Sequence, residues 1–200
     1  MRIMKIKRII FYLLVIGIVA VISGCVRYPG EPGPEPGEPE YQLEITVEVK
    51  GQINTDEGIY YIVLDADGNP ATGPGEDILP WEDSYYYIKL ENDFFYFAKP
   101  EESFEYYTGE ISDDSKSFQV SIVLSDLIED PNSIDINVIT TDSENNTYDH
   151  LDSYFNINTN HGSKPPIFDS SGDSGDGGAD FDIVSVKAKI KTPFEKAFIN

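Results

Sequence analysis

Four oxygen-bearing side chains in one stretch of the chain have the types and spacing of a calcium site. They are Asp65, Asp67, Asn69 and Glu76. Calcium takes about six to eight oxygen ligands, and Gly68 allows the tight turn that would bring alternate side chains together. Glu76 is the twelfth residue counted from Asp65, as in the calcium loops of helix–loop–helix proteins, whereas Pro70 and Pro74 exclude their helical exit. The alternative interpretation is a β-turn of residues that tolerate left-handed backbone.

Aromatic side chains are the second candidate for ligand contact. Tyr85 and Tyr87 alternate along the chain with an apolar set that consists of Tyr86, Ile88 and Leu90. If the apolar set faces the core, the two tyrosines form a partly exposed stripe on the other face of the strand. Flat rings with a polar edge stack on sugars or anchor a protein partner, and Trp81, just after a proline, could serve likewise. The alternative is that aromatic residues simply favour strands.

Catalysis has no comparable pattern, so the chain is not expected to be an enzyme. Neither His150 nor His161 stands in a recognisable serine, cysteine or metal-site arrangement. With 36 acidic residues in the chain, any particular pair of carboxylates is uninformative. A single cysteine permits neither an intramolecular disulfide nor a multi-cysteine zinc cluster.

The elements that would position these residues are β-strands. Apolar and polar residues alternate with a period of two, which is typical of half-buried strands. Strands are predicted at residues 43–49, 59–64, 85–90, 94–98, 104–107, 118–124, 134–138 and 184–190. Glu91, Asn92 and Asp93 predict a hairpin turn, and residues 125–128 predict a single helical turn capped by Ser125. About eight short strands separated by turns predict an all-β fold, an antiparallel β-sandwich.

Residues 59–90 also resemble known extracellular sandwiches. A strand that ends in Asp65-Ala66-Asp67, followed by Gly-Asn-Pro-x-Thr-Gly and a tyrosine-rich strand, is similar to the front half of DOMON-like domains and family-nine-type carbohydrate-binding modules. The resemblance continues through residues 117–127 and 134–141 and covers roughly half the chain. It implies a domain that binds a sugar, haem or another small ligand, with calcium in some members. Haem is not expected, because its methionine or histidine ligands there would have to come from His150 and His161 alone.

The first residues of the chain predict a location outside the cytoplasm. Four basic residues precede an uncharged run at residues 9–22, which is shorter than the roughly 20 residues of a membrane-spanning helix. Ile22-Ser23-Gly24-Cys25 then resembles the bacterial lipoprotein signal. The resemblance implies a signal peptide at residues 1–24, a diacylglycerol group on Cys25, and a fatty acid such as palmitate on the new amino terminus. Two or more acyl chains would hold the protein on the cell membrane or outer membrane, facing outward. The alternative is an uncleaved membrane anchor.

The rest of the chain divides into a linker, a domain and a tail. Lipidated Cys25 begins a linker at residues 25–40 whose prolines, glycines and glutamates predict an extended, solvated segment. The sandwich domain is expected at residues 41–191, with a mobile acidic loop at 169–180, and a C-terminal tail at 192–200. After residue 24 there are 36 acidic against 10 basic residues, so nucleic acid is excluded as a partner.

These patterns favour a membrane-anchored, non-catalytic binding module whose partner is a saccharide or an envelope protein. No cofactor is required by this hypothesis, and calcium is the one candidate. The alternative is a structural or accessory envelope protein without a small-molecule ligand, and a carboxylate-dependent hydrolase is the third hypothesis. An exposed, coplanar aromatic platform would favour the binding module, whereas a uniformly polar surface with every ring buried would favour the structural protein. Two converging buried carboxylates in a cleft would favour the hydrolase.

Overall fold

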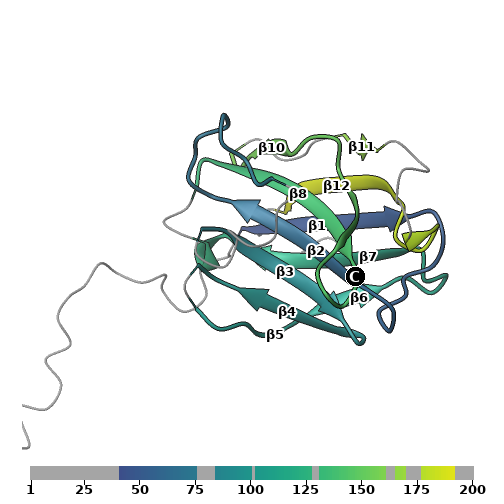
Figure 1. Ribbon diagram of the computed structural model, residues 1–200. Coiled ribbons are helices and arrows are strands. Elements are labelled where there is room, and N and C mark those ends of the chain that lie inside the picture. Colours follow the sequence, from purple (N-terminus) through teal and green to yellow (C-terminus); the bar gives the residue numbers. More distant parts are fainter. Residues whose placement is uncertain are drawn as a thin grey trace, which may run out of the picture. The chain divides into compact units, whose positions relative to one another are not determined.

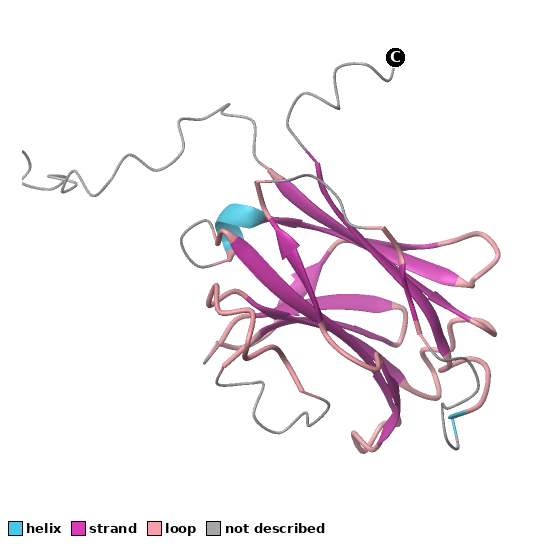
Figure 2. Ribbon diagram, turned by 90° about the horizontal axis from the view of Figure 1, so that it is seen from above, coloured by secondary structure: helices cyan, strands magenta, loops and turns pink. Residues whose placement is uncertain are grey.

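The described part of the chain is an antiparallel β-sandwich, which confirms the predicted fold class. The computed structural model describes residues 41–75, 84–100, 102–127, 131–160, 165–169 and 177–191. They form two sheets that face each other (Figures 1 and 2). The predicted signal peptide at 1–24, Cys25, the predicted linker at 25–40 and the predicted tail at 192–200 lie outside the described residues.

The smaller sheet places the first and last described strands side by side. In spatial order it contains β11 (Ile167–Phe168), β12 (Ile183–Lys191), β1 (Gln42–Val49), β7 (Ser117–Val123) and β6 (Gly109–Ile111). In β1, Leu43, Ile45 and Val47 are fully buried because they share one face of an alternating strand. The opposite face is polar, and there Glu44 forms ion pairs with two lysines of β12, which are Lys189 and Lys191.

The larger sheet carries the hairpin to which the predicted ligand residues belong. In spatial order it contains β10 (Phe155–Asn158), β8 (Ser133–Thr141), β2 (Ile59–Asp65), β3 (Tyr86–Glu91), β4 (Phe94–Ala98) and β5 (Glu105–Tyr107). β9 (Thr147–His150) pairs with the last residues of β8. Figure 1 shows β2, β3, β4 and β5 following one another toward the lower edge of the domain. β2 is buried on both faces, which explains its unbroken apolar sequence.

The main core lies between the two sheets and is centred on Tyr60. This side chain is fully buried, and its ring stacks on Phe181 with 5.4 Å between centroids. Its hydroxyl donates to the carbonyl of Asp180 (3.0 Å) and accepts from the backbone N–H of Asn54 (2.8 Å). A separate outer cluster lies on the other face of the larger sheet, and its buried members are Ile59, Tyr61, Val63 and Ile139.

The strand count differs from the prediction of about eight. Each of the eight predicted segments is a strand, and the described residues contain 12 strands in all. The additional strands β6, β9, β10 and β11 have only two to four residues each, too few for a period of two to be recognised. The helical turn is a 3-10 turn, η1 (Leu124–Asp126), which begins one residue early. The prediction that Ser125 caps it is wrong, because Val123 is at the cap position and no side chain caps the turn.

The chain passes from the larger to the smaller sheet between β5 and β6. Gly109 allows a close approach there, because a Cβ at this position would lie 2.7 Å from the ring of Phe95. Next to it, the hydroxyl of Tyr107 donates to the carbonyl of Ser121 on β7 (3.0 Å). These contacts fix the position of β5, whose outward side chains belong to the site described below.

Candidate ligand-binding site

Four aromatic side chains gather on the outer face of the larger sheet, over β4 and β5. We call them the aromatic patch, and they are Phe94, Tyr96, Phe104 and Tyr106. The solvent-exposed fraction is 54% for Phe94, 54% for Phe104 and 75% for Tyr106. An exposed group of large apolar rings on a soluble domain marks an interaction surface more often than a structural need.

A two-residue hairpin turn determines which rings share this face. Asn92 (φ 50°) and Asp93 (φ 64°) both adopt the left-handed conformation, as in the turns that join twisted antiparallel strands. Glu91 therefore pairs with Phe94, and Lys89 pairs with Tyr96. Tyr96 in turn pairs with Tyr106 on β5, so these outward side chains form one row across three strands.

The rings of the aromatic patch contact one another at steep angles and are not coplanar. Tyr96 and Tyr106 have centroids 5.1 Å apart and planes inclined by 35°. Phe104 meets Tyr96 edge-on (5.4 Å, 77°), and Phe94 meets Tyr106 edge-on (5.9 Å, 73°). These four rings therefore do not form the coplanar platform that was expected of a binding module, and the patch presents both ring faces and ring edges.

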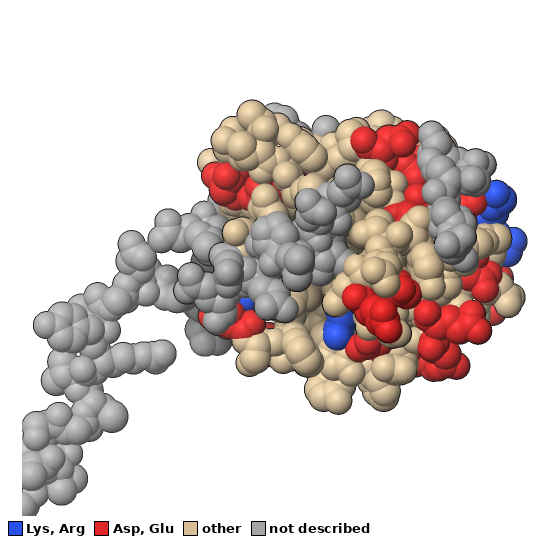
Figure 3. All heavy atoms as spheres, in the orientation of Figure 1, with Lys and Arg blue, Asp and Glu red and all other residues tan. Residues whose placement is uncertain are grey.

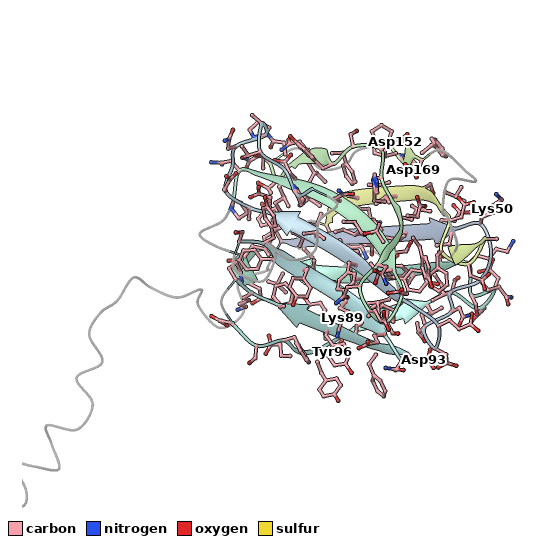
Figure 4. The ribbon with its side chains drawn as sticks, viewed as in Figure 1. Lys50, Lys89, Asp93, Tyr96, Asp152 and Asp169 are labelled. Atoms are coloured by element: carbon pink, nitrogen blue, oxygen red, sulfur yellow. The ribbon has the colours of Figure 1, made fainter. Side chains whose placement is uncertain are left out.

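Lys89 places a positive charge against these rings. Its Nζ lies 5.2 Å from the centroid of Tyr96 and 5.0 Å from that of Phe104, within the range of cation–π attraction. The same Nζ forms an ion pair with Glu91 (3.0 Å). Figure 4 shows Lys89 and Tyr96 together near the lower edge of the domain. Loss of hydration, followed by the neighbouring Tyr106 hydroxyl and the Glu91 carboxylate, raises the pKa of Tyr96.

The predicted stacking residues Tyr85 and Tyr87 are on the outer face, as the alternation required. Tyr86, Ile88 and Leu90 face the core. Both tyrosines are half-buried and pack against the outer cluster, where Tyr87 meets the ring of Tyr61 edge-on at 6.0 Å. They therefore support the sheet beside the aromatic patch, while the more exposed rings lie on β4 and β5. Trp81 lies outside the described residues.

The predicted calcium residues Asp65, Asp67 and Asn69 form a chain of side-chain-to-backbone hydrogen bonds, which we call the acidic turn. Asp65 Oδ1 accepts from the N–H of Asp67 (3.0 Å), and Asp67 Oδ1 accepts from the N–H of Asn69 (2.6 Å). Asn69 Oδ1 then accepts from the N–H of Ala71 (3.3 Å). Gly68 has a positive φ of 75° within this turn. Such bonds are those expected of the turn interpretation, in which aspartate and asparagine hold their own backbone.

A second buried carboxylate lies beside the acidic turn. Asp65 is directly opposite Asp135 in the pairing of β2 with β8, and both are buried. Burial, followed by the charges of Asp67 and Asp135, raises the pKa of Asp65. Among the described residues no group of three or more His, Cys, Asp or Glu side chains is arranged to hold a metal ion. Glu76, the fourth predicted ligand, lies outside the described residues, so the calcium hypothesis stays a prediction.

The remaining candidates are placed only in part. His150 Nδ1 lies 2.9 Å from the carbonyl of Leu151, a local contact at the end of β9. His161 and residues 170–176 of the predicted acidic loop lie outside the described residues. The end of that loop is bound to the domain, because Asp180 Oδ1 accepts from the N–H of Gln52 (2.9 Å).

The aromatic patch is the feature that the sequence analysis missed. The strand at residues 94–98 was expected, but its outward face was not assigned. The signal was present in the turn: a two-residue connection through Asn92 and Asp93 fixes Phe94 and Tyr96 on the same face as Lys89. The contribution of β5 was harder to find, because a three-residue strand has no clear alternation.

Comparisons with known proteins give no direct indication of function. No protein family, no curated protein and no solved structure matches the chain. In the part of the chain that the structure describes, no helix has the length and apolar character needed to cross a membrane.

Proposed function

We propose that this chain is a membrane-anchored extracytoplasmic lipoprotein that acts as a non-catalytic binding module and holds a saccharide on its aromatic patch. The observation that carries the proposal is the exposure of Phe94, Phe104 and Tyr106 on the outer face of the larger sheet. The resemblance of Ile22-Ser23-Gly24-Cys25 to a lipoprotein signal supports the anchor.

The chemistry of the patch suits a sugar. A pyranose has apolar C–H faces that pack on aromatic rings, and Tyr106 offers the most exposed ring for such a contact. A sugar also carries hydroxyl groups, which need both donors and acceptors. Tyr106 is 75% exposed, and its hydroxyl can both donate and accept a hydrogen bond beside the rings.

The proposal that the aromatic patch binds a saccharide is tested on a glycan array with the full chain, purified in detergent. Tyr106→Ala removes the most exposed ring of the patch, and Phe168→Ala is the matched control, since Phe168 is equally exposed (75%) but lies on β11 of the other sheet. We expect Tyr106→Ala to weaken glycan binding about tenfold, which corresponds to about 1.4 kcal/mol, and Phe168→Ala to leave it unchanged.

Two results would contradict saccharide binding by the aromatic patch. Wild-type protein that binds no glycan, or binding that the two variants reduce equally, would favour a structural or accessory envelope protein. The anchor is tested separately by the mass of the intact protein. We expect a chain that begins at Cys25 and carries a diacylglycerol group and a fatty acid. An unmodified chain that keeps residues 1–24 would indicate an uncleaved apolar anchor instead.

A further inference from the structure

The aromatic patch has an acidic border. Three carboxylate side chains adjoin its rings in the chain or across the sheet, and they are Glu91, Asp93 and Glu102. Asp93 and Glu102 are exposed to solvent. Figure 3 shows several areas of acidic surface on this face of the domain, with few basic atoms among them. A ligand that reaches the patch therefore enters a negative field.

Lys89, whose ammonium contacts these rings, does not reverse this field. Lys89 is ion-paired with Glu91 at 3.0 Å, and its side chain is only 17% exposed. Its charge is thus balanced before any ligand arrives, and its ammonium is directed to Tyr96 and Phe104. The faces of the rings themselves carry the negative part of the aromatic quadrupole, which also repels anions.

We propose that the aromatic patch selects saccharides without acidic groups, which are neutral or amino-bearing, and that its acidic border rejects uronate-containing and sulfated chains. The inference rests on the proposed saccharide function and adds the charge class of the ligand. An anionic group brought over the patch would approach several carboxylates at once in a chain with a formal net charge of −22. The free-energy cost of binding an anionic glycan is electrostatic, so this cost should decrease as salt screens the carboxylates of the border.

The test is a glycan array with neutral, amino-bearing, uronate-containing and sulfated members, probed with the full chain at low and high salt. Glu91→Gln releases the charge of Lys89 and removes one border carboxylate. We expect this variant to bind uronate-containing glycans about tenfold more tightly than wild type at low salt, and the gain to shrink at high salt. Glu110→Gln is the control, because Glu110 is an exposed acid on β6 of the other sheet.

The outcomes separate this inference from the proposed function. Wild-type binding that Tyr106→Ala weakens and that is confined to glycans without acidic groups supports both. Tyr106-dependent binding of uronate-containing or sulfated glycans by wild type overturns the selectivity and leaves the function standing. An unchanged uronate signal in Glu91→Gln, with circular dichroism showing a folded variant, also overturns it. No Tyr106-dependent glycan binding overturns the proposed function, and the selectivity fails with it.

Discussion

Replacing Asp65 with asparagine is expected to stabilise the domain by about 1 kcal/mol at pH 7 in the presence of EDTA. Asp65 is 5% exposed and lies directly opposite Asp135, which is 2% exposed. Like charges directly opposite each other in an antiparallel pair cost up to about 1 kcal/mol, and burial adds to this cost. Asparagine keeps the oxygen that accepts from the N–H of Asp67, and its amide group can donate toward Asp135.

The effect should depend on pH with a definite sign. Burial and the neighbouring carboxylates raise the pKa of Asp65 in the folded state above its unfolded value. The folded state then binds this proton more tightly than the unfolded state does. The contribution of Asp65 to stability is therefore most favourable below the unfolded pKa, about 3.9, and declines as the pH rises through the raised folded value. Asparagine does not titrate, so the advantage of the variant grows from about pH 4 upward.

Chemical denaturation at several pH values measures this difference. Asp56→Asn is the control, because Asp56 is exposed and its removal changes the net charge by the same amount. A variant that is less stable than wild type at pH 7 in EDTA would refute the reasoning.

Calcium provides a second comparison. If the acidic turn binds calcium, the ion raises the unfolding midpoint of wild type by mass action and raises that of Asp65→Asn much less. A wild-type midpoint that calcium does not change would contradict the calcium hypothesis.

Two further predictions concern the core and the outer face of the smaller sheet. Gly58→Ala should cost about 2 kcal/mol in thermal unfolding, because its Cβ would lie 2.5 Å from the carbonyl oxygen of Thr141, whereas Gly75→Ala meets nothing within 4 Å and should be neutral. Burial alone would raise the pKa of Glu44, but hydrogen bonds from two lysines of β12 lower it. Its stabilisation is therefore present above the unfolded pKa and is lost as the pH falls through the folded value. Glu44→Gln should cost about 1 kcal/mol at pH 7 and almost nothing at pH 3, and an equal loss at both pH values would contradict the ion pair as the cause.

The parts of the fold that follow from local alternation were predictable from the sequence. At the start of β3, the alternation of Tyr85 and Tyr87 with a buried set identified both faces of the segment correctly. The prediction works because one face of such a strand packs on the core and the other faces outward, so successive side chains alternate between the two environments. The four additional strands β6, β9, β10 and β11 were not predicted, since they form where neighbouring strands offer hydrogen-bonding partners.

Contacts between distant segments could not be predicted from the spacing of residues. The acidic turn was recognised as a group of oxygen ligands, but its buried neighbour Asp135 is 70 positions further along the chain than Asp65. Only the register of β2 with β8 brings the two carboxylates together. The prediction of a helix cap was wrong for a local reason. The turn η1 has only three residues, and a 3-10 turn this short forms without a side-chain cap.

The aromatic patch is not explained by the stability of the fold. Folding favours the burial of large rings, yet Tyr106 and Phe94 leave more than half of their surface in water beside β5, the outermost strand of the larger sheet among the described residues. Exposed rings next to a sheet edge promote association between copies of a protein. The large negative charge opposes such association, because it makes any two copies repel each other. Acidity and exposed rings are therefore compatible, because repulsion between copies of the chain opposes the association that the exposed rings would promote.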